Sequence, residues 1–112
     1  MLAATGQKLT NFNKSRKGDF SEYYAVTWLW DKGYEVFKNA GCSGPIDLIA
    51  YHLETQETLL IDVKTFFAHP ESGIYNRASE GRSQLQKDLG VVLLAFDPST
   101  RKLRFIDHRE TK

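Results

Sequence analysis

Blocks of apolar residues separated by polar turns predict two helices in this chain. In the first, aromatic and aliphatic residues recur at helical spacing up to about Lys32, and Gly33 follows its end. The second is short and runs to about Leu89. The candidate first residues or caps are Ser15 or Asp19 for the first helix and Ser83 or Arg82 for the second.

Five shorter apolar runs predict strands. They cover residues 34–37, 46–53, 58–65, 91–96 and 102–107. The run at 91–96 is continuous, as in a strand buried on both faces, and the last run is typical of an edge strand. Residues 1–14 are weakly patterned and are interpreted as a loose arm, and residues 66–81 as a long polar loop. The order α-β-β-β-α-β-β predicts an α/β fold, with one central mixed sheet flanked by helices.

Length and composition favour one globular domain. The chain has 112 residues, of which 41% are hydrophobic and 26% charged. No apolar run approaches the ~20 residues that span a bilayer, and the first residues do not resemble a secretory signal. The one cysteine excludes an internal disulfide and a multi-cysteine zinc site. We therefore expect no membrane association and a cytoplasmic location, in the host cell if a phage encodes the chain.

The net charge of +1 does not indicate a nucleic-acid partner by itself. Basic residues nevertheless gather before the first helix and around the second. Those considered as DNA contacts are Lys14, Arg16, Lys17, Arg77 and Arg82. Either group also fits a solvated face. Backbone amides near Ser43 are a further candidate phosphate contact, although a plain tight turn explains that residue as well.

Three charged residues fall in or beside apolar runs that read as core strands. Asp62 and Lys64 are two positions apart, so they share one face of a strand. Asp47 enters the preceding run directly after Gly44-Pro45-Ile46. Charges on a buried face cost several kcal/mol unless they are paired or bind a metal. The alternatives are a structural ion pair for Asp62 with Lys64 and a turn residue for Asp47.

Chain order predicts that these charges converge. A hairpin through residues 54–57 sets position 47 opposite about 63 to 64, at the same end as Asp62 and Lys64. On the first helix, Glu22 shares a stripe with Val26 and Leu29, so we expect it to point toward this end of the sheet, or otherwise to be a solvated helix residue.

Three carboxylates and an ammonium group suit metal-dependent cleavage of a phosphodiester. Hard oxygen ligands favour Mg²⁺, and Mn²⁺ is expected to substitute for it. The metal activates water, while the lysine orients the water or stabilises the phosphate. The three histidines have no ligand-like spacing.

The same residues resemble a known superfamily. Gly44-Pro45-Ile46-Asp47 followed by Asp62-Val63-Lys64 is similar to the motif of the PD-(D/E)xK, or restriction endonuclease-like, nucleases. Upstream, Gly18-x-x-x-Glu22 and the sequence after the first helix resemble archaeal Holliday junction resolvases and intron-associated homing endonucleases. The resemblance covers about residues 16 to 97 and implies an αβββαβ core. Position 62 carries Asp where Glu is commoner, which shortens the reach to a metal.

The resemblance also implies roles for individual residues. Asp47 and Asp62 would ligate the metal, the carbonyl of Val63 would assist them, and Lys64 would be the catalytic lysine. Glu22 would ligate the metal or support its ligands. A glutamine of the second helix, Gln84 or Gln86, would face the site, and we take Gln84 as the candidate.

The leading hypothesis is therefore a Mg²⁺-dependent DNA endonuclease that leaves a 5′-phosphate. So small a chain offers little surface for reading DNA, which predicts a dimer or tetramer. One rival is a non-catalytic DNA-binding or assembly module that retains the nuclease fold. The presence of all three charged residues, Asp47, Asp62 and Lys64, argues against it. A nucleotide-binding domain is a weaker rival, because the chain has no glycine-rich phosphate loop.

Overall fold

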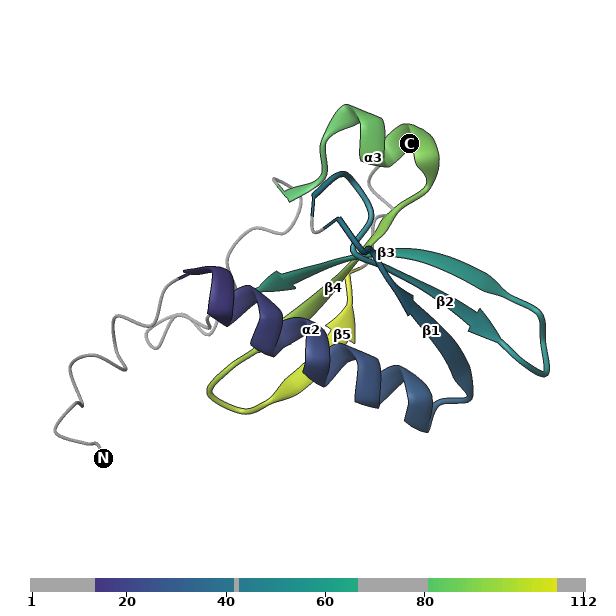
Figure 1. Ribbon diagram of the computed structural model, residues 1–112, viewed down its shortest axis with the longest axis horizontal. Coiled ribbons are helices and arrows are strands. Elements are labelled where there is room, and N and C mark those ends of the chain that lie inside the picture. Colours follow the sequence, from purple (N-terminus) through teal and green to yellow (C-terminus); the bar gives the residue numbers. More distant parts are fainter. Residues whose placement is uncertain (1–13, 42, 67–80, 107–112) are drawn as a thin grey trace, which may run out of the picture.

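The computed structural model describes residues 14–41, 43–66 and 81–106, so residues 1–13 of the predicted N-terminal arm and 67–80 of the predicted polar loop lie outside it, while Lys14 belongs to the first helix. Within these ranges, two helices and five strands occur in the predicted order (Figure 1). Their bounds are α2 Lys14–Asp31, β1 Tyr34–Lys38, β2 Leu48–His52, β3 Thr58–Thr65, α3 Gln84–Leu89, β4 Val92–Asp97 and β5 Lys102–Phe105. The α/β class predicted from the sequence is confirmed.

The five strands form one mixed sheet in the order β1-β2-β3-β4-β5. Neighbouring strands are antiparallel except β3 and β4, which are parallel because the connection through α3 returns the chain to the same end of the sheet. Strand β4 is buried along nearly its whole length, as its continuous apolar run predicts, while β5 forms one edge of the sheet. Strand β1 forms the other edge.

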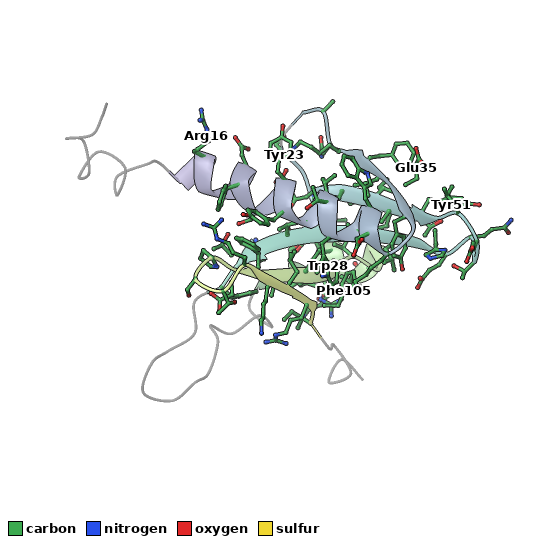
Figure 2. The ribbon with its side chains drawn as sticks, turned by 90° about the horizontal axis from the view of Figure 1, so that it is seen from below. Arg16, Tyr23, Trp28, Glu35, Tyr51 and Phe105 are labelled. Carbon is green, nitrogen blue, oxygen red and sulfur yellow. The ribbon has the colours of Figure 1, made fainter. Side chains whose placement is uncertain are left out.

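Helix α2 covers one face of this sheet (Figure 2). Ala25 and Leu29 are one turn apart, and both are fully buried against strand residues that include Ile61 and Leu94. Trp28 packs on Phe105 of β5 with its ring centroid 5.6 Å from the phenyl centroid. The helix already includes Lys14, so Ser15 and Asp19 lie inside it and the predicted cap at either residue is wrong. Of the described helices, none is long and apolar enough to span a membrane.

Helix α3 is short, and adjacent residues of the chain cap both of its ends. Ser83 is the N-cap, and its hydroxyl accepts a hydrogen bond from the N–H of Gln86, whose side chain accepts one from the N–H of Ser83 in return. Gly90 ends the helix in the left-handed conformation that favours glycine. Of the two predicted starting residues, the structure therefore selects Ser83 over Arg82. The helix lies at one end of the sheet, beside the loop that joins β1 and β2 (Figure 1).

Candidate active site

Two carboxylates oppose each other where β2 begins. The pairing of Leu48 with Ile61, continued by one residue, sets Asp47 opposite Asp62. The predicted partners of position 47, residues 63 to 64, are thus wrong by one or two positions. The predicted strand 46–53 also begins later, at Leu48. Asp47 accepts a hydrogen bond of 2.8 Å from the N–H of Val63 to its Oδ2, so the correct register brings the two acids directly together.

The β1–β2 loop holds Asp47 in place. The side-chain amide of Asn39 donates to the carbonyls of Ser43 and Ile46 at 2.8 and 2.9 Å, and its oxygen accepts from the N–H of Gly41. Gly44 has φ +107°, which residues with a side chain rarely adopt, and it turns the chain into Pro45. The backbone N–H of Asp47 then donates to Ile61 at 2.8 Å. The loop therefore holds the carboxylate of Asp47 in one orientation at the start of β2.

Lys64 completes the group on the same face. Its Nζ lies 3.5 Å from Oδ2 of Asp62, and the Asp62 side chain is 9% exposed whereas that of Lys64 is 41% exposed. On the next residue, the Thr65 hydroxyl hydrogen-bonds Ser21 of α2. Because side chains alternate along a strand, Asp62 and Lys64 project from the sheet face that α2 does not cover. The acid is enclosed and the ammonium group reaches toward solvent.

The glutamine that reaches this site is Gln86 rather than Gln84. Gln86 is buried, and its Nε2 donates to Oδ2 of Asp62 at 3.1 Å and to the carbonyl of Pro45 at 2.8 Å. Gln84 is exposed and hydrogen-bonds Asp88 within its own helix. The choice of Gln84 is corrected for a geometric reason: Ser83 caps the helix, so the third residue after it turns inward and the first does not.

Replacing each of the two glutamines in turn distinguishes their contributions to stability. We expect Gln86→Leu to lower the free energy of unfolding by about 1–3 kcal/mol, because a buried carbonyl and carboxylate lose their donor. Gln84→Leu, the same chemical change two residues earlier at an exposed position of the helix, should change it by less than about 0.5 kcal/mol. Urea unfolding followed by circular dichroism measures both. Equal losses from the two variants would contradict the assignment of Gln86.

Glu22 does not join the two aspartates as a third member of one cluster. Its Oε1 accepts a 2.6 Å hydrogen bond from Nζ of Lys38, at the end of β1. Within residues 14–41, 43–66 and 81–106, no group of three or more His, Cys, Asp or Glu side chains is arranged to hold a metal ion. Lys38 was not anticipated, since an ion pair between a helix and an edge strand leaves no local pattern in the sequence.

The charges and burial of the site act most strongly on the pKa of Asp47. Its pKa is raised from 3.8 to about 7. Burial is the largest cause, followed by the hydrogen bond with the Asp62 carboxyl, and the charges of Asp62 and Glu22 raise the pKa further. The N–H of Val63 acts in the opposite direction because it stabilises the carboxylate. Two acids are therefore held together at an energetic cost that a bound cation would remove.

Three groups at this point have oxygen atoms that could ligate a metal ion. Besides the carboxylates of Asp47 and Asp62, the backbone of Val63 contributes, because the N–H and C=O of one strand residue point to the same side. Its N–H bonds Asp47, so its carbonyl also points to the side of β3 on which Asp47 lies. Carboxylate and carbonyl oxygens are the hard ligands that Mg²⁺ prefers, with water or substrate supplying the remainder. The donor set therefore fits such an ion.

Of the predicted DNA contacts, Arg16, Ser43 and Arg82 have side chains in the described part of the chain. Arg16 is exposed on α2, with Nε 3.9 Å from Oδ2 of Asp19. Arg82 donates to the carbonyl of Val91 at 3.1 Å and so ties the start of α3 to β4. Ser43 is exposed, and its carbonyl accepts the bond from Asn39. The side chains of Lys14 and Lys17, and the whole of Arg77, lie outside the described part of the chain.

No protein-family model and no curated protein matches this sequence significantly. Among solved structures, the chain is similar to a bacterial homing endonuclease, I-Ssp6803I, with a TM-score of 0.62. The sequences are 20% identical, and the match covers 88% of this chain and 67% of that chain. At this identity the likeness establishes the fold: this chain has the α/β architecture on which that endonuclease is built.

Proposed function

We propose that this protein is a metal-dependent DNA endonuclease of the PD-(D/E)xK type. The observation that carries the proposal is the pair Asp47 and Asp62, set face to face with Lys64 two residues along the same strand. A shared fold with a homing endonuclease supports the substrate class. An ion pair built only for stability would not need a second, buried acid such as Asp47, whose pKa is raised to about 7 by burial first and then by Asp62.

The residues of the site divide the work of phosphodiester hydrolysis. Asp47, Asp62 and the Val63 carbonyl would hold Mg²⁺ or Mn²⁺, which supplies charge neutralisation and an activated water when bound. Lys64 lies close enough to Asp62 to orient the attacking water or to contact a phosphate oxygen. Gln86 holds Asp62 in place through the hydrogen bond from its Nε2 to Oδ2 of the carboxylate. Glu22, held by Lys38, adds negative potential that favours a cation near Asp47.

Metal binding should depend on pH through Asp47. Below its pKa of about 7 the carboxyl carries a proton, which a metal ion must displace. The affinity for Mn²⁺ should therefore rise about tenfold per pH unit up to pH 7 and level off above it, a gain of roughly 30-fold between pH 5.5 and 7.5. Titration calorimetry across this range measures it. An affinity independent of pH would show that Asp47 is not a ligand.

The activity is tested with purified protein and three substrates: supercoiled plasmid, a four-way junction and single-stranded DNA. Each is incubated with Mg²⁺ or with EDTA. Mg²⁺-dependent cleavage that produces 5′-phosphate ends supports the proposal, and the preferred substrate distinguishes a junction resolvase from an enzyme specific for duplex sites. Tight DNA binding without cleavage under any condition would favour the non-catalytic module instead.

Cutting both strands of a duplex requires two such sites, and α2 offers a surface for pairing two copies. Tyr23, Thr27 and Trp30 follow 4-3 spacing on the side of the helix away from the sheet, and Trp30 is 60% exposed. Phe20 begins this stripe, and its ring also lies 6.2 Å from that of Phe96 in β4. Figure 2 shows Tyr23 on this outer side and Trp28 on the inner side. We propose that a second copy packs on this stripe by two-fold symmetry.

A single charge should disrupt that assembly. Trp30→Glu places a carboxylate on the stripe and is expected to convert the dimer to a monomer, measured by light scattering after size-exclusion chromatography. Glu35→Gln, at an exposed position of the β1 edge, is the control and should leave the mass unchanged. A wild-type protein that is monomeric at all concentrations would refute the pairing.

A further inference from the structure

The sheet face that carries the site continues beyond Lys64 toward β5. Lys64 pairs with Ala95 of β4, and Ala95 pairs with Arg104 of β5, so the three residues form one row across the sheet. Neighbouring residues of adjacent strands point to the same face. Leu103 and Phe105 pack toward the core under α2, so Arg104 between them projects from the opposite face, as does Lys102. Two strand spacings separate the Cα atoms of Lys64 and Arg104 by about 10 Å.

The surface along this row is hollowed. A cavity of about 280 Å³ is lined by Phe66, Ala95, Asp97, Lys102, Leu103 and Arg104. Ala95, whose side chain is small, is the strand residue between Lys64 and Arg104 in this row. The hollow is therefore a lateral extension of the site on the same face of the sheet.

The charge of the hollow is positive at its rim. Lys102 and Arg104 are exposed. Asp97 is the acid among the lining residues, but it is buried, and its Oδ1 accepts bonds of 2.9 Å from both the N–H and the hydroxyl of Ser99. This carboxylate therefore faces Ser99, and the exposed charges among the lining residues are the two cations. With Lys64, three cations follow one another on this face, and the acids of the site lie beyond them.

We propose that this hollow holds the DNA backbone beside the cleaved linkage, with Arg104 and Lys102 contacting one or two phosphates next to the one at Lys64. The inference rests on the proposed nuclease function and adds to it the direction in which the cleaved strand crosses the sheet, from β3 over β4 to β5. Arginine and lysine contacts to phosphates position DNA without reading its sequence. The contribution of this surface should therefore be similar for every DNA sequence and sensitive to salt.

Binding measurements on the full chain test this assignment. Fluorescein-labelled DNA, either a duplex or a four-way junction, is titrated with protein in Ca²⁺ at 50 to 300 mM salt, and anisotropy reports binding. Arg104→Gln and Lys102→Gln should each weaken binding by about tenfold at 150 mM salt and lower the salt dependence by about one contact. Lys32→Gln removes the same charge on the α2 side of the sheet, where Nζ of Lys32 lies 4.5 Å from the Trp28 ring, and should bind as wild type does.

A second measurement locates the contact on the DNA. A neutral methylphosphonate replaces, one linkage at a time, the phosphates that flank the cleavage site. At one flanking position the replacement should weaken wild-type binding by about the same factor as Arg104→Gln, and it should not weaken the Arg104→Gln protein further. Additive losses at every position, or variants that bind like wild type, would overturn the assignment and leave the nuclease proposal standing. A wild-type protein that neither binds nor cleaves DNA would overturn both.

Discussion

Asp47→Asn is expected to abolish detectable metal-dependent cleavage, with a loss of at least about 10³-fold in rate, and to stabilise the metal-free protein. Asparagine keeps an oxygen that can accept the bond from the N–H of Val63, so the local structure is retained. It removes one of the two anionic ligands proposed for the metal, which should weaken binding of a hard divalent cation. Cleavage assays and Mn²⁺ titration measure the functional loss, and thermal or urea unfolding measures the stability.

The gain in stability has a defined pH range. The pKa of Asp47 is about 7 in the folded protein and near 3.8 unfolded, so the folded state binds more protons between these values. The contribution of Asp47 to stability therefore falls as the pH rises from about 4 to about 7, and is constant above that range. Asp47→Asn should be more stable by about 1 kcal/mol at pH 8, a figure reduced for solvent screening of a half-buried group, and equally stable at pH 4.

Glu54→Gln is the matched control for this variant. It also removes one carboxylate, but from the exposed β2–β3 hairpin loop at the opposite end of the sheet. It should change neither cleavage nor the pH dependence of stability. If Asp47→Asn destabilised the protein at pH 8, the repulsion between Asp47 and Asp62 would not be the dominant energy at the site.

The second large effect is expected from Lys64→Ala, which should lower the rate of cleavage by about 10²–10³-fold without weakening metal binding. The ammonium group lies 3.5 Å from Oδ2 of Asp62, so its removal leaves that carboxylate more negative. Affinity for Mn²⁺ should therefore be unchanged or higher, even though the reaction is slower. Single-turnover cleavage and calorimetry of the same protein preparation give the two values.

This combination distinguishes a catalytic lysine from a structural ion pair. Were Lys64 present only to neutralise Asp62, its loss would lower stability and leave the cleavage rate of the folded fraction intact. Lys87→Ala removes an exposed lysine from the last turn of α3 and serves as the control, with no change expected in either measurement. A Lys64→Ala protein as active as wild type would remove Lys64 from the mechanism.

The fold was predictable because its signals are local. Apolar runs, the Ser83 cap and the turn residues each depend on a few neighbouring positions, and together they predict the order of helices and strands along the chain and the α/β class. The meeting of Asp47 with Asp62 was predictable for a related reason: a short hairpin brings its two outer ends together even when the assumed register is wrong by one or two residues.

The remaining features of the site depend on contacts between distant segments. Whether Gln84 or Gln86 faces the acids is decided by which residue caps a helix, and one position of uncertainty turns a side chain by about 100°. Lys38 was missed because its partner, Glu22, is on another element. The row from Lys64 to Arg104 requires the order of β3, β4 and β5 across the sheet, which the sequence does not specify by itself.

The six residues of α3 are too few to form a stable helix in isolation. The helix is stabilised in part by Gln86, which hydrogen-bonds to Asp62 and to the loop before β2. Because Gln86 and Lys64 approach the same oxygen of Asp62, a cation that reorganises this carboxylate must also alter the free energy of folding the helix. By thermodynamic reciprocity, a partner that orders or loosens α3 would change the metal affinity of the site by the same factor. The order of this short helix and the state of the Asp62 carboxylate are thus thermodynamically linked.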